Sequence, residues 1–251
     1  MKKRIFLTAA VAVLSSALLA ACSSGGKNAN QPVTYTYVFS SDPATLDYTV
    51  SGNSSTKQVT GNVIDGLLEN DQYGNLVPSV AEDWSVSKDG LTYIYKIRKG
   101  IKWYTNEGEE YGEVKAQDFV TGLKHAVAKK SQALYLVQDS IKGLDDYING
   151  KTNDFSTVGI KATDDYTLVY TLNNPESFWN SKTTMGVLAP INEDFLASKG
   201  DDFGKPTDVT SILYNGPYLL KGLTSKSSIE MTKNQRSEER RVGKECVSTC
   251  R

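Results

Sequence analysis

The amino-acid sequence predicts a fold that mixes β-hairpins with α-helices, in the α/β or α+β class. Two segments alternate apolar and polar residues on both sides of a short turn, which is the period of a half-buried strand. Two other segments repeat apolar residues at every third or fourth position, which is the period of a helix with one buried face. Because these helices lie between the hairpins along the chain, we expect them to cover a sheet.

The predicted elements begin with a strand at residues 34–39 (TYTYVF), since β-branched and aromatic residues favour extended backbone. A helix is predicted next, with Ser54 or Ser55 as its N-cap and the polar sequence NDQYGN as its end. The apolar residues at helical spacing in this segment are Val59, Val63, Ile64, Leu67 and Leu68.

Two hairpins follow, with two helices between them. Residues 84–97 (WSVSKDGLTYIYKI) predict a hairpin around an Asp-Gly turn, and residues 158–172 (VGIKATDDYTLVYTL) predict a second one. Helices are predicted at about 116–128 and 134–148, and their apolar stripes are interpreted as core. One face of the second hairpin is expected to carry Tyr166, Leu168, Tyr170 and Leu172.

The first residues have the layout of a secretory signal peptide. Cationic residues at positions 2–4 precede the apolar run Ile5–Ala21, and the sequence Leu-Ala-Ala-Cys that ends at Cys22 resembles the lipobox of bacterial lipoproteins. This resemblance implies cleavage after residue 21, acylation of Cys22 and a flexible lipidated tether over residues 22–32. Two or more acyl chains give stable anchoring, since each buried methylene adds about 0.8 kcal/mol. An ordinary leader with a chance cysteine is the alternative.

Composition and motifs favour a binding protein over an enzyme. The net charge is −1, and both ends are net positive, so the segment from Cys22 to Gln235 carries −6 and nucleic acid is not an expected partner. The sequence lacks a nucleophile elbow, a phosphate loop and a His-Glu-x-x-His zinc motif, so no cofactor or metal is expected. The single histidine, His125, is expected to be exposed on a helix. A penicillin-recognising serine hydrolase using Ser54 and Lys57 is a remote alternative.

Two long segments carry a resemblance to a known family. Residues 81–104 (AEDWSVSKDGLTYIYKIRKGIKWY), followed by residues 114–126 (VKAQDFVTGLKHA), resemble the signature of extracellular solute-binding proteins of family 5, the receptors of ABC importers for peptides. SSDPATLDYTVSGNSS resembles the ligand-side loop of the family, and YNGPYLL resembles its Gly-Pro-Tyr strand entry. ESFWNSKTTMGVLAPIN is most similar to peptide-binding lipoproteins of streptococci and their relatives.

The resemblance implies an α/β, periplasmic-binding-protein-like fold of type II. Lobe I would have its core in residues 33–65 and 174–235, with an α+β subdomain of hairpins and helices inserted at 66–173. The second lobe is expected to be missing. The last residues, 236–251 (RSEERRVGKECVSTCR), are expected to be foreign to the family, and a genuine basic tail is the alternative. Without a second cleft wall, peptide binding by the 251-residue chain is expected to be feeble.

The resemblance also implies the ligand and the partners. The ligand would be an oligopeptide, handed to the ABC permease subunits by a monomer held on the outer face of a Gram-positive cell membrane by its lipid alone. Other family ligands, namely a nickel chelate, haem, a sugar or a peptide pheromone, stay open. Main-chain contacts to the peptide are carried over to Ser51, Gly52 and Asn53, with a second candidate group at Tyr214, Asn215 and Gly216.

Two further residues are interpreted from their surroundings. Trp179 is interpreted as a core residue, with a ligand pocket as the alternative. Lys115 stands where the family usually has Thr at a helix N-cap. Because an ammonium group cannot accept a hydrogen bond, we expect this cap to be weaker by about 1 kcal/mol.

The anchor prediction can be tested by replacing Cys22 with Ala. Cys22→Ala removes the thiol that would be acylated, so we expect the protein to move from the membrane fraction to the medium and to lose its label in cells fed an alkyne palmitate analogue. Cys246→Ala is the matched control and should leave both unchanged. Retention of the label by Cys22→Ala would show that the lipobox interpretation is wrong.

Overall fold

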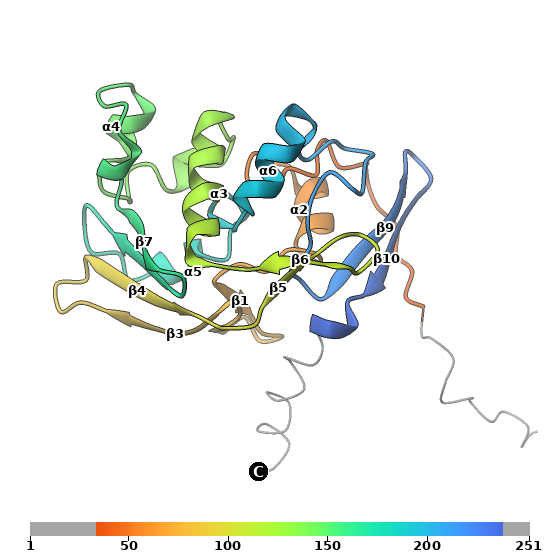
Figure 1. Ribbon diagram of the computed structural model, residues 1–251, viewed down its shortest axis with the longest axis horizontal. Coiled ribbons are helices and arrows are strands. Elements are labelled where there is room, and N and C mark those ends of the chain that lie inside the picture. Colours follow the sequence, from red (N-terminus) through yellow and green to blue (C-terminus); the bar gives the residue numbers. More distant parts are fainter. Residues whose placement is uncertain (1–33, 238–251) are drawn as a thin grey trace, which may run out of the picture. The chain divides into compact units, whose positions relative to one another are not determined.

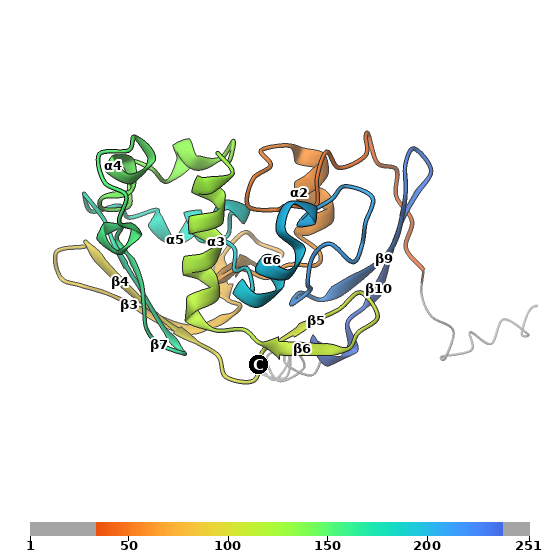
Figure 2. The ribbon, with the colours of Figure 1, turned by 45° about the horizontal axis from the view of Figure 1, so that its top comes forward.

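A four-stranded antiparallel sheet and one long helix organise the fold, which the computed structural model describes for residues 34–237 (Figures 1 and 2). The strand order in the sheet is β3-β4-β8-β7. The bounds of these strands are β3 Ala81–Val86, β4 Thr92–Ile97, β7 Ile160–Asp164 and β8 Thr167–Thr171. The two predicted hairpins are thereby confirmed, and they join edge to edge through β4 and β8.

The buried face of this sheet is aromatic. Tyr95 and Tyr170 are fully buried, and their rings meet edge to face with centroids 6.1 Å apart. Trp179, the first residue of helix α5 (Trp179–Lys182), is also fully buried and lies 5.1 Å from the Tyr170 ring. Such pairs stabilise a core beyond the area they bury. The interpretation of Trp179 as a core residue is confirmed.

Helix α3 (Ala116–Ala128) has the bounds that the apolar period predicted. Its residues Phe119, Leu123 and Ala126 are fully buried, and the helix packs on β7 and β8. The ammonium of Lys115 lies 2.8 Å from the Asp165 carboxylate and takes no part in capping. Asp118 instead accepts hydrogen bonds from the Lys115 backbone N–H (3.1 Å) and from the Trp103 indole N–H (2.8 Å).

The remaining strands form three two-stranded hairpins. In Figure 1, the β9–β10 hairpin lies at the opposite end of the drawn ribbon from helix α4. The bounds are β1 Leu68–Asn70, β2 Leu76–Pro78, β5 Lys102–Tyr104, β6 Glu110–Glu113, β9 Tyr218–Thr224 and β10 Ser228–Lys233. Short helices cover the rest: α2 Ser54–Thr60, α4 Leu144–Ile148, α6 Glu193–Lys199, and 3-10 turns at Leu134–Leu136, Phe155–Thr157, Gly186–Leu188 and Gly200–Asp202.

The predicted helix after Ser54 is wrong in its length. Helix α2 ends at Thr60 and its N-cap is Asn53, while Leu68 begins strand β1. The cause is tertiary, because the backbone beyond the helix bonds to residues 215–218: the Val63 carbonyl accepts from Gly216 N–H at 3.0 Å. In a continued helix the same carbonyl would have to accept from a residue four positions further on.

Two other predicted elements are also wrong. Residues 34–39 are not a strand, since β-propensity describes a fit to neighbouring strands and does not create a ladder. The predicted helix at 134–148 is split into the 3-10 turn and α4, because Gly143 has a φ of +70° and the Lys142 N–H donates to the Thr171 carbonyl at the end of β8. A side chain at Gly143 would stand 2.6 Å from the Thr157 carbonyl oxygen.

Several predictions fall wholly or largely outside the described residues, namely the signal peptide, Cys22 with its tether, and residues 238–251 of the tail. From Phe39 onward the described residues form one compact unit, and its division into a lobe core and an inserted subdomain stays a prediction. Over residues 34–237, no helix is long and apolar enough to cross a membrane.

The buried Asp118 predicts a pH-dependent stability. Burial raises its pKa to about 6, against about 3.9 in an unfolded chain, so the folded state holds the proton more tightly. The stability that this proton contributes is present below pH 4 and is lost as the pH rises through about 6. We expect the free energy of unfolding of the wild type, relative to Asp118→Asn, to fall by on the order of 1–3 kcal/mol between pH 4 and pH 7.

Urea unfolding at several pH values measures this difference. Glu82→Gln, which changes an exposed carboxylate on strand β3, is the control and should run parallel to the wild type. Parallel curves for the wild type and Asp118→Asn would contradict the prediction.

Candidate functional site

The first predicted group, Ser51, Gly52 and Asn53, closes a loop that we call the ligand-side loop, residues 45–53. The loop lies directly before helix α2. Ser51 is buried, whereas Gly52 and Asn53 are exposed. The Ser51 hydroxyl accepts from the Asn53 N–H at 3.1 Å, and the Ser51 N–H donates to the Asp47 carbonyl at 3.3 Å. Ser51 and Asn53 are therefore hydrogen bonded within their own loop.

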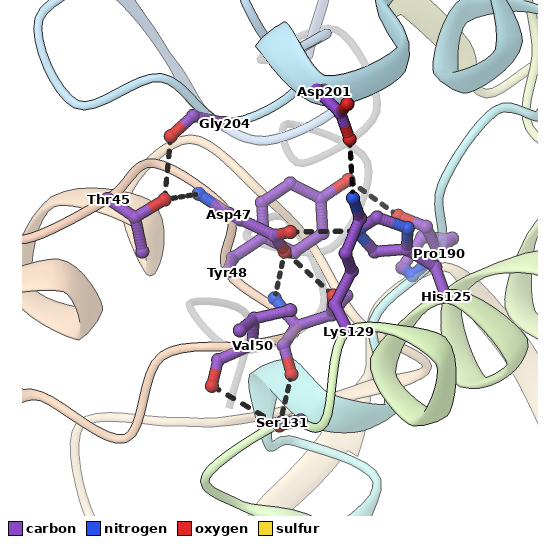
Figure 3. A network of polar contacts seen from close by, with 11 residues as sticks. Thr45, Asp47, Tyr48, Val50, His125, Lys129, Ser131, Pro190, Asp201 and Gly204 are labelled. Carbon is purple, nitrogen blue, oxygen red and sulfur yellow. Dashed lines mark hydrogen bonds and ion pairs between the residues drawn. The ribbon is translucent and has the colours of Figure 1, made fainter.

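The start of the ligand-side loop is fixed by Gly204 (Figure 3). The Gly204 carbonyl accepts from the Leu46 N–H at 2.7 Å and from the Thr45 hydroxyl at 2.6 Å. Gly204 has a φ of +73°, and a Cβ there would stand 2.4 Å from the Asp47 nitrogen. Only glycine allows this approach of the two backbones.

Asp47 lies at the centre of the network and bonds to the lone histidine. Its Oδ1 accepts from the N–H (3.1 Å) and the hydroxyl (2.8 Å) of Thr49, and its Oδ2 lies 2.7 Å from His125 Nε2. The prediction that His125 is exposed is wrong, since only 7 % of the residue is exposed. No sequence signal marked it, because His125 lies off the apolar stripe that Phe119, Val120, Leu123 and Val127 form on this helix.

The turn that ends helix α3 makes a second set of contacts with the ligand-side loop. Lys130 adopts a left-handed conformation (φ +54°), and the Ser131 N–H returns to the Ala126 carbonyl at 2.8 Å, which closes the helix in the manner of a Schellman motif. This turn brings two residues to the ligand-side loop that the sequence analysis missed, Ser131 and Gln132. No local pattern marks them.

Ser131 and Gln132 bind the loop through its main chain. The Ser131 hydroxyl donates to the Thr49 carbonyl at 2.6 Å, and the Gln132 N–H donates to the Val50 carbonyl at 3.0 Å. The Gln132 side-chain oxygen accepts from the Gly52 N–H at 3.0 Å. The turn after helix α3 is thus tied to the main chain of the loop at Thr49, Val50 and Gly52.

The second predicted group lies elsewhere and is buried. The Tyr214 hydroxyl donates to the Val209 carbonyl, and the Asn215 amide pairs with both the N–H (2.8 Å) and the carbonyl (3.1 Å) of Asp65. Asn215 and Gly216 bond to the chain beyond the C-terminal end of α2, whereas the backbone of Tyr214 pairs with Tyr104. All three residues are buried, and their contact with a ligand stays a prediction.

A cavity of about 230 Å³ lies beside α2, lined by Tyr48, Lys57, Met185 and Ala189 among others. This volume is below the usual range of about 300–1,000 Å³ for small-molecule sites, so it fits one side chain of a larger ligand. Most of its lining surface is apolar, and Lys57 adds a cation.

Neither the serine–lysine pair of the remote alternative nor a metal cluster is assembled in the part of the chain that the structure describes. Ser54 and Lys57 are both exposed on α2, whereas an activated serine–lysine pair needs a desolvated lysine. Within residues 34–237, no group of three His, Cys, Asp or Glu side chains is placed to hold a metal ion.

Residues 75–239 match the family model of bacterial extracellular solute-binding proteins, family 5 Middle. The chain belongs to this family. It is 62% identical over 235 residues to the oligopeptide-binding protein AmiA and 64% identical over 231 residues to AliA, both from Streptococcus pneumoniae serotype 4. These alignments cover 93% and 92% of the chain but only 36% and 35% of the relatives, so the chain spans about a third of their length.

Solved structures agree with the predicted periplasmic-binding-protein-like architecture. The substrate-binding domain of an oligopeptide ABC transporter from Bacillus anthracis superposes with a TM-score of 0.74 at 25% identity, covering 82% of this chain and 38% of that one. Listeria monocytogenes OppA bound to peptide superposes with a TM-score of 0.69 at 31% identity, covering 76% and 37%.

The close approach at Gly204 predicts a large loss of stability on substitution. Gly204→Ala would place a methyl group against Asp47 as well as strain the backbone. Gly100→Ala is the matched control, because Gly100 has a φ of +81° with open space around it. We expect Gly100→Ala to cost about 1–2 kcal/mol and Gly204→Ala a further ~1–3 kcal/mol. Denaturant unfolding measures both, and equal losses would contradict the described contact.

Proposed function

We propose that this protein captures oligopeptides and delivers them to the permease of an ABC importer. The observation that carries the proposal is the ligand-side loop, whose main chain is held by hydrogen bonds from both ends of its own segment and from Ser131 and Gln132. The membership of the chain in the solute-binding family and the peptide-bound structure of the Listeria relative support an oligopeptide as the ligand.

A held main chain suits a receptor that must accept many peptide sequences. All peptides share their backbone N–H groups, and these can donate to main-chain carbonyls of the loop. The N–H groups of Ser51, Gly52 and Asn53 already donate to Asp47, Gln132 and Ser51, so the proposed contacts are made by the carbonyls of Ser51 and Gly52. A loop that is already ordered loses little conformational entropy on binding, and the affinity gains accordingly. Ligand side chains then sit in roomy, wet pockets, and the small cavity beside α2 is one candidate.

In this proposal, the second predicted group, Tyr214, Asn215 and Gly216, supports the loop indirectly. Asn215 and Gly216 fix the chain after α2, and the helix carries the loop end at Asn53. We further propose that the protein works as a monomer on the outer face of the membrane, attached only through an acylated Cys22.

The main-chain mechanism predicts a characteristic specificity. Because the relatives are about three times longer, the test uses a hybrid in which residues 34–233 replace the matching part of the pneumococcal AmiA relative. Methylating a peptide nitrogen that pairs with the loop should cost about 1–3 kcal/mol of binding free energy, since a buried partner loses its hydrogen bond. Changing a ligand side chain should cost less.

Isothermal titration calorimetry with a peptide scanned by N-methylation measures these costs. The unsubstituted AmiA relative is the control and shows which peptide positions are sensitive there. Insensitivity of the hybrid to N-methylation at every position would rule out the main-chain mechanism. Tight binding of a metal chelate, haem or a sugar in place of peptides would assign a different ligand class.

A further inference from the structure

We propose that His125 is a positioning residue for the ligand-side loop, acting through its hydrogen bond to Asp47. The consequence for peptide affinity rests on the proposed function, whereas the consequence for the loop itself does not. Figure 3 shows the imidazole pointing from helix α3 at the Asp47 carboxylate.

The His125–Asp47 pair is buried, and the hydrogen bond between the two side chains is short. The side chains of His125 and Asp47 are 6 % and 9 % exposed, and Nε2 and Oδ2 are 2.7 Å apart. A buried carboxylate oxygen without a donor is unfavourable, so the imidazole N–H is the group that allows Asp47 to remain inside. The Phe203 ring packs edge-on against the imidazole with centroids 5.3 Å apart and restricts its orientation.

The nearby cation does not offer a substitute for the imidazole. The Lys129 ammonium lies 2.8 Å from the Asp201 carboxylate, in an ion pair at the exposed rim. Tyr48 is buried, and its hydroxyl donates to the Pro190 carbonyl at 2.8 Å, away from Asp47. Burial and the charge of Asp47 raise the pKa of Tyr48 well above its usual value, so it stays neutral.

Asp47 connects the imidazole of His125 to the loop through its own hydrogen bonds. Its Oδ1 holds the N–H and hydroxyl of Thr49, and its carbonyl accepts from the N–H groups of Val50 (3.4 Å) and Ser51 (3.3 Å). The other end of the loop is held by Gln132, which follows the same helix. Helix α3 therefore fixes the loop at two points, and the geometry assigns the first of them to His125.

The test compares His125→Phe, which removes the donor, with His125→Gln, which keeps an N–H at nearly the reach of Nε2. His125→Asn, whose amide ends short of Asp47, serves as a second loss variant if the phenylalanine is not accommodated. Lys124→Gln changes the exposed neighbour on the same helix and is the matched control.

Amide hydrogen exchange, followed by NMR on the 251-residue chain, measures the exchange rates of the loop amides directly. We expect the amides of Thr49 and Ser51 to exchange at least tenfold faster in the loss variants, within threefold of wild type in His125→Gln, and unchanged in Lys124→Gln. Amides of the β4–β8 ladder are the internal standard. Unchanged loop exchange in a folded loss variant, or failure of His125→Gln to restore protection, would overturn the proposal.

Peptide binding by the hybrid supplies the second measurement. The loss variants should bind at least tenfold more weakly and His125→Gln within threefold of the unsubstituted hybrid. If the loss variants exchange faster and bind equally well, His125 positions the loop but the consequence for peptide affinity is wrong. If the unsubstituted hybrid binds no peptide, the proposed function fails, and the exchange data alone decide whether His125 positions the loop.

Discussion

The burial of the Asp47 carboxylate constrains the rest of the site. A carboxylate removed from water must have its oxygens hydrogen bonded, and here Thr49 and His125 supply the donors. This requirement fixes the ligand-side loop against helix α3, and the helix is fixed in turn by its packing on β7 and β8. The site therefore inherits its rigidity from the four-stranded sheet through one buried helix.

The need to pair buried polar groups also explains why the segment after α2 leaves the helical conformation. Asn215 pairs with both backbone groups of Asp65, and the Gly216 N–H meets the Val63 carbonyl. These bonds replace those that a longer helix would have made, so the helix is short and its N-terminal end stays next to the loop. Asn215 and Gly216, which are predicted ligand contacts, thus also fix the backbone after α2.

A receptor for many peptides needs a binding surface that does not depend on ligand side chains. In the proposed function this need is met by the ligand-side loop, whose main chain Ser131 and Gln132 bind at two carbonyls and one N–H. Pre-ordering the loop moves the entropic cost of binding into folding. The chain spans about a third of the length of its pneumococcal relatives.

The sequence by itself determined the local elements whose period is unambiguous: helix α3 with its bounds, both hairpins of the main sheet, and Trp179 as core. It also pointed to the family and to the loop at Ser51–Asn53, because those signals lie in contiguous residues. Only the tertiary structure decided where α2 ends, why residues 134–148 are broken, and that His125 is buried. Each depends on a hydrogen-bond partner that is distant along the chain, such as Asp47 for His125, and local propensity carries no information about such a partner.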